Sequence, residues 1–81
     1  QPFVFGSGAV ARTTEELVEL CDQNWAQARQ HLNAGDFDRW FRAQNRHDLV
    51  SKAKSARLER NEDAALEAFL RRLTPGFKRR A

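Results

Sequence analysis

The sequence predicts an all-α fold, a compact bundle of about five short helices with an extended N-terminal arm. Apolar residues recur at spacings of three and four along most of the chain, which is the period of a helix that buries one face. Residues typical of helix starts and stops divide this pattern into short segments. No apolar run approaches the ~20 residues that a membrane-spanning helix needs, so we expect no membrane partner.

The composition is that of one ordinary folded domain. The chain has 81 residues, of which 41% are hydrophobic and 31% charged, with a formal net charge of +3. Cys21 is the single cysteine, so the chain cannot form an internal disulfide, and we expect a reducing compartment, the cytoplasm. Because the chain begins with Gln1 rather than Met, we expect a domain cut from a longer protein.

Residues 1–12 are expected to form an extended arm or linker. The triplet Phe3-Val4-Phe5 is strand-like, and Gly6-Ser7-Gly8 favours a turn. Two interpretations stay open. Either Phe3 and Phe5 pack on the helical body, or the triplet adds to the edge of a neighbouring domain's sheet.

The first helix is predicted to begin with a capping box in Thr13-Thr14-Glu15-Glu16. Thr13 is the expected N-cap, and Glu16 is expected to reach back to it. The inward side of this helix consists of Leu17, Leu20 and Cys21. The helix ends or bends between Asp22 and Asn24.

The run Asn24–Phe41 is expected to organise the core as two short helices joined by a tight turn. Both tryptophans lie in it, and its apolar residues are Trp25, Ala28, Leu32, Phe37, Trp40 and Phe41. Gly35 is a natural left-handed stop for the first of these helices, and Asp36 is a natural cap for the second, which runs to about Gln44.

Two further helices complete the predicted bundle. The fourth, at about 48–60, has Asp48 as its cap, buries Leu49, Val50, Ala53 and Ala56, and directs Lys52, Lys54 and Arg57 outward. Asn61 is the expected cap of the fifth, which buries Ala65, Leu66, Phe69, Leu70 and Leu73 before Thr74-Pro75-Gly76 ends it. The helical domain therefore spans residues 13–75, and residues 76–81 form a basic tail or linker with Lys78, Arg79 and Arg80.

The sequence carries no pattern that indicates a metal site or a catalytic centre. Cys21, His31 and His47 lack the close spacing of zinc ligands, and Cys21 falls on the apolar side of its helix. Carboxylate pairs such as Asp36/Asp38 stand at helix starts, where the helix dipole accounts for them. We expect no enzymatic activity, no cofactor and no small-molecule ligand.

Two binding functions remain, and the same residues serve both. Arg39, Arg42 and Arg46 recur at spacings of three and four, so a basic helical nucleic-acid-binding domain is one alternative. Interspersed acidic residues weigh against it and favour a protein–protein interaction module, an adaptor or docking unit, whose partner is a protein domain in the same polypeptide or complex. The candidate partner-binding residues are Arg39, Arg42, Arg46, Trp40, Arg57 and Arg60.

The runs TTEELVELCDQNW, HLNAGDFDRWF, NRHDLV and DAALEAFLRRLTP, together roughly Thr13–Pro75, resemble a small helical module of large bacterial multidomain proteins. In those proteins the module lies beside kinase-like, Hsp70-like, repeat or other signalling modules. The resemblance rests on the spacing of Trp, Leu, Gly and Asp-Leu. It implies an accessory or interaction role in a bacterial, cytoplasmic protein and carries over no functional residues.

Overall fold

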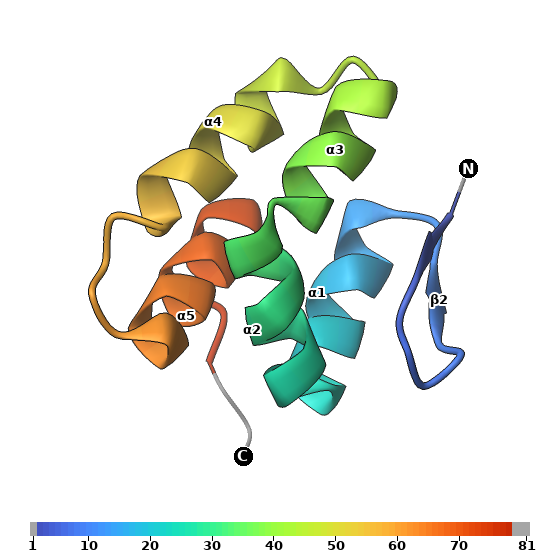
Figure 1. Cartoon of the computed structure of the whole chain (residues 1–81), viewed down its shortest axis with the longest axis horizontal. Helices are drawn as coiled ribbons and strands as arrows, with labels where there is room; N and C mark the ends of the chain where they lie inside the picture. The colour runs from blue at the N-terminus through green and yellow to red at the C-terminus, as the bar shows by residue number, and fades with distance from the viewer. Residues whose placement is uncertain (1, 79–81) are drawn as a thin grey trace.

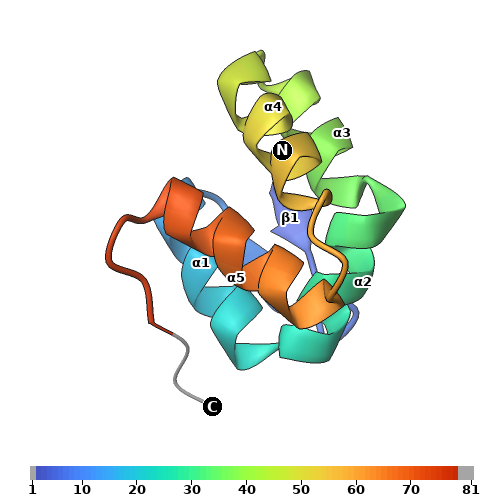
Figure 2. The same cartoon turned by 90° about the vertical axis from the view of Figure 1, so that its left-hand side faces the viewer.

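The computed structural model describes residues 2–78 and confirms the predicted helical bundle (Figures 1 and 2). Its helices are α1 (Thr14–Gln23), α2 (Trp25–Ala34), α3 (Asp36–Ala43), α4 (His47–Ala56) and α5 (Glu62–Leu73). Two short strands, β1 (Phe3–Val4) and β2 (Val10–Ala11), precede them and pair antiparallel, with Phe3 opposite Ala11. The molecule measures 29 × 25 × 23 Å.

Within the N-terminal arm, residues 3–11 fold back as a hairpin that packs on the helices. The turn closes with two backbone hydrogen bonds, from the Phe5 amide to the Ala9 carbonyl and from the Gly8 amide to the Phe5 carbonyl, each 2.9 Å long. Phe3 and Phe5 are buried in the same core as the helices. Of the two interpretations of the triplet, packing on the helical body is therefore the one found.

The hairpin is fixed by aromatic contacts with α2 and α3. The ring of Phe3 lies 4.9 Å from that of Phe37, 5.0 Å from His31 and 5.8 Å from Trp40, measured between centroids. The contacts with His31 and Trp40 are edge to face, and that with Phe37 is tilted. Such contacts add to the free energy gained by burying the rings.

The start of α1 confirms one half of the predicted capping box and corrects the other. Thr13 Oγ1 accepts a hydrogen bond from the Glu16 amide at 3.1 Å, as an N-cap should. The Glu16 carboxylate, however, accepts from the amide of Arg12 at 2.7 Å, one residue earlier than the box predicts. The shift ties the end of the hairpin to the first turn of α1.

Single residues join α1 to α2 and α2 to α3. Asn24 lies between the first pair, and its side-chain amide donates to the Leu20 carbonyl at 2.9 Å. Gly35 lies between the second pair with φ of 79°, as expected for a left-handed stop. Asp36 is the first residue of α3 and not its cap, a correction to the sequence-based expectation. Its carboxylate instead bonds to His31 and Arg39.

The fourth helix is shorter than predicted, and its cap is different. It begins at His47, and Asp48, the predicted cap, lies inside the first turn with its carboxylate paired to Arg46. It ends at Ala56, and the side chain of the next residue, Arg57, turns inward to Asp38 instead of facing solvent. Leu49, Val50, Ala53 and Ala56 are buried as expected.

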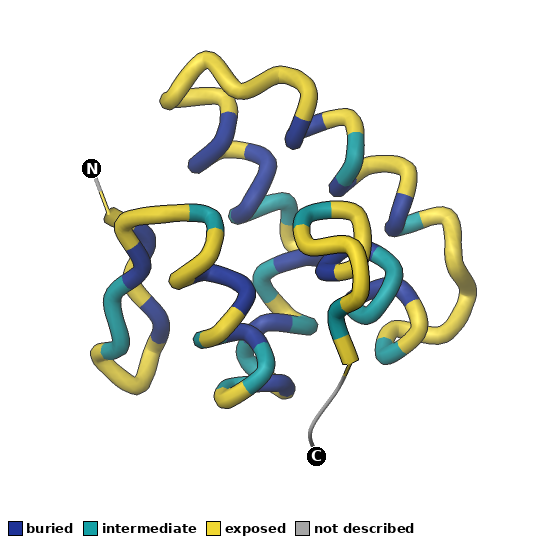
Figure 3. The backbone as a smooth tube through the Cα atoms, turned by 180° about the vertical axis from the view of Figure 1, so that it is seen from behind, coloured by how far each residue is buried: buried dark blue, intermediate teal, exposed yellow. Residues whose placement is uncertain are grey.

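The fifth helix starts as predicted. Asn61 Oδ1 accepts from the amides of Asp63 and Ala64 at 2.8 and 3.1 Å. All the aromatic residues predicted for the core, Trp25, Phe37, Trp40, Phe41 and Phe69, are buried, and Phe37 stacks on Phe69 at 5.5 Å. Figure 3 shows the buried residues along the inward sides of the helices. Of the predicted basic tail, Arg79 and Arg80 lie outside the described residues.

Candidate functional site

Trp40, a candidate partner-binding residue, lies in the core. It is 9% exposed, and its ring lies 5.4 Å from that of Phe41 and 5.8 Å from that of Phe3. The structure therefore gives Trp40 a packing role between the hairpin and α3. Trp25 is also 9% exposed, and its indole nitrogen donates to Asp63 at 2.7 Å.

Three of the five candidate arginines are held by carboxylates of the same chain. Arg39 pairs with Asp36, and Arg46 pairs with Asp48 at 3.2 Å. The hydrogen bond to Asp48 is also the main reason why the pKa of the Arg46 guanidinium is raised. Both pairs lie at the surface, where such pairs contribute little to stability. They do, however, reduce the positive charge that α3 and the start of α4 present to a ligand.

Arg57 belongs to a buried pair rather than to the surface. Its two terminal nitrogens donate to the two carboxylate oxygens of Asp38 at 2.7 and 2.8 Å, and one of them also donates to the Leu32 carbonyl at 3.2 Å. Asp38 is 5% exposed. The hydrogen bond to Asp38 raises the pKa of Arg57, which keeps the guanidinium charged. The prediction that Arg57 faces outward is wrong, because this fork joins α2, α3 and the end of α4.

Arg42 and Arg60 are exposed, and within residues 2–78 neither forms an ion pair. The five candidate arginines therefore do not share one environment. Arg39 and Arg46 each pair with a carboxylate at the surface, and Arg57 pairs with the buried Asp38.

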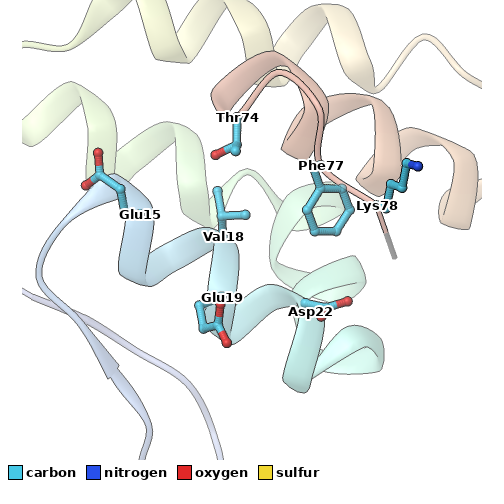
Figure 4. A pocket seen from close by; sticks show the side chains of 7 residues that line it. All are labelled: Glu15, Val18, Glu19, Asp22, Thr74, Phe77 and Lys78. Carbon is cyan, nitrogen blue, oxygen red and sulfur yellow. The ribbon is translucent and has the colours of Figure 1, made fainter. Parts of the chain in front are cut away.

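A hollow in the surface lies elsewhere, between α1 and the segment that follows α5 (Figure 4). This hollow, which we name the α1 cleft, has a volume of about 300 Å³. Its lining consists of Glu15, Val18, Glu19, Asp22, Thr74, Phe77 and Lys78.

The α1 cleft combines apolar and acidic surface with one basic side chain, Lys78. Glu15, Glu19 and Asp22 stand four and three residues apart, so they share one face of α1 and bring three carboxylates to one side of the hollow. Val18 and Phe77 supply the apolar part. Such a surface suits a side chain with an apolar stem and a positive end, as lysine and arginine have.

The cleft is formed by residues far apart in the sequence. Phe77 reaches α1 because the chain turns after α5: the amide of Phe77 donates to the Thr74 carbonyl at 3.0 Å, and Gly76 has φ of 91°. The sequence signal that was present, Thr74-Pro75-Gly76 after a helix, predicts the end of α5 but not where the following residues return. The acidic face of α1 was visible as Glu15 and Glu19 opposite Leu17 and Cys21.

Cys21 is buried, and burial raises the pKa of its thiol well above the usual range, which disfavours the thiolate that a nucleophile or metal ligand needs. Among residues 2–78, no three His, Cys, Asp or Glu side chains are grouped so as to hold a metal ion. No helix in this part of the chain is both long and apolar enough to span a bilayer.

Comparison with family models, with curated proteins and with solved structures found no match for this chain.

Proposed function

We propose that this domain is a non-enzymatic protein–protein interaction module, an adaptor or docking unit, which holds a basic segment of a partner protein in the α1 cleft. The observation that carries the proposal is the composition of the cleft, a hollow of about 300 Å³ in which the exposed carboxylate of Glu15 lies with the apolar side chains of Val18 and Phe77. The Glu15 carboxylate favours a cationic partner, and the apolar residues favour the methylene stem of its side chain. The proposal moves the interaction site from the arginines to α1.

The partner that fits this site is a protein domain in the same polypeptide or complex, in a bacterial cytoplasmic protein of several domains. Cys21 supports a cytoplasmic setting, because it is a buried free thiol and not part of a disulfide. The bacterial and multidomain setting rests on the resemblance of residues 13–75 to accessory helical modules.

The alternative, a basic nucleic-acid-binding domain, has less support. Phosphate binding needs exposed cations in one patch, whereas Asp36, Asp48 and Asp38 each hold one of the candidate arginines. A gel-shift assay at low salt with generic double-stranded DNA and with RNA tests it. We expect no retardation at protein concentrations where a nonspecific binder retards the probe, and a salt-dependent shift would favour the alternative.

A capped tetrapeptide Leu-Lys-Leu-Arg is a direct probe of the α1 cleft. In ¹⁵N-HSQC spectra we expect titration with this peptide to shift the amides of α1 and of residues 74–78. The capped peptide Leu-Glu-Leu-Glu should leave them in place, because its charges are repelled by the carboxylates.

The variant Glu15→Lys should remove this response, while Glu59→Lys, which makes the same change in charge on an exposed residue outside the cleft, should retain it. Shifts that Glu15→Lys does not reduce, or that fall mainly on α3 and α4, would overturn the assignment of the site.

A further inference from the structure

No further inference is drawn: the strongest candidate, the exposed Leu58 on the turn between α4 and α5, is a single apolar side chain, and nothing in the described residues shows what covers it.

Discussion

At the scale of residues, the interaction least visible in the sequence is the pair of Asp38 and Arg57. Asp38 is nearly fully buried and Arg57 is three-quarters buried, so each charge depends on the other for the hydrogen bonds that water would otherwise supply. The pair does not have to add much net stability to be important. Loss of one partner leaves the other charge uncompensated.

Asp38→Ala should therefore lower the free energy of unfolding by about 2–3 kcal/mol, less than for a completely buried pair because water still reaches part of Arg57. Urea denaturation followed by tryptophan fluorescence measures it. Asp48→Ala, which removes the exposed partner of Arg46, is the matched control and should leave the midpoint unchanged within error. Equal effects of the two substitutions would show that the Asp38 pair is as well solvated as a surface pair.

His31 should make stability depend on pH. Its Nδ1 lies 2.8 Å from an oxygen of Asp36, and the rings of Phe3 and Phe5 approach it edge to face. Burial lowers the pKa of His31 from its ordinary value of 6.5, since the charged imidazolium is disfavoured there. The unfolded chain therefore takes up the proton more readily than the folded one. The resulting stability is present above 6.5 and is lost as pH falls through the folded pKa.

Urea midpoints at about pH 7.5 and about pH 5, compared between the unaltered domain and His31→Gln, isolate this contribution from that of the carboxylates. We expect the unaltered domain to lose more stability on acidification than His31→Gln does. Equal losses of stability in the two proteins would show that the negative charge of Asp36, which favours the imidazolium, completely offsets the effect of burial on the pKa of His31.

At the scale of elements, the helices were predictable because their signals are local. Thr13 and Asn61 cap helices within three residues of themselves, and Gly35 supplies a conformation that other residues adopt with difficulty. The predictions that failed involve side chains with competing partners. Asp36 and Asp48 have the chemistry of caps, but His31 and Arg46 bind them instead. The direction of the Arg57 side chain was mispredicted because its partner, Asp38, lies nineteen residues away.

Gly35→Val should destabilise the domain by about 1–2 kcal/mol, because a side chain at φ of 79° is strained. The cost is one of backbone conformation, since the only atom that an added Cβ would meet is the flexible end of Arg39, at 4.0 Å. Gly35→Asn should accordingly cost less than Gly35→Val. Gly6→Ala, where an added Cβ makes only an ordinary contact with Gln27, is the control for chemical denaturation.

At the scale of the whole molecule, one core joins the hairpin to all five helices. Most of its helical members were predictable from helical spacing, although Val18 was not expected inside and Leu20 and Leu73, expected inside, are only partly buried. The α1 cleft was not predictable, because it needs residues 74–78 to return to α1. Local patterns report which residues are buried, but surfaces made from distant segments follow only from the complete arrangement.

This arrangement predicts opposite consequences for two large apolar residues. Trp40→Ala should lower the free energy of unfolding by about 3–5 kcal/mol, because it opens a cavity between Phe3 and Phe41. For a domain this small, such a loss is a large part of the total. Leu58→Ser should leave thermal stability nearly unchanged, because its side chain is exposed. Near-native melting of Trp40→Ala would contradict the packing role given to Trp40.

The joints at Asn24 and Gly35 have a consequence for how this chain can change in length. Each is one residue long, so neither has spare residues to take up a change in length. A residue inserted at a joint either lengthens it or joins the neighbouring helix, whose residues then shift by about 100° around its axis, and either change would move Phe37 and Phe41 relative to Phe69. From Thr14 to Ala43 the chain should thus accept substitutions far more readily than single-residue insertions. Alanine insertion after Asn24 and after Glu59, compared by expression as folded protein, would reveal this asymmetry, since the connection between Ala56 and Glu62 is longer than the one-residue joints.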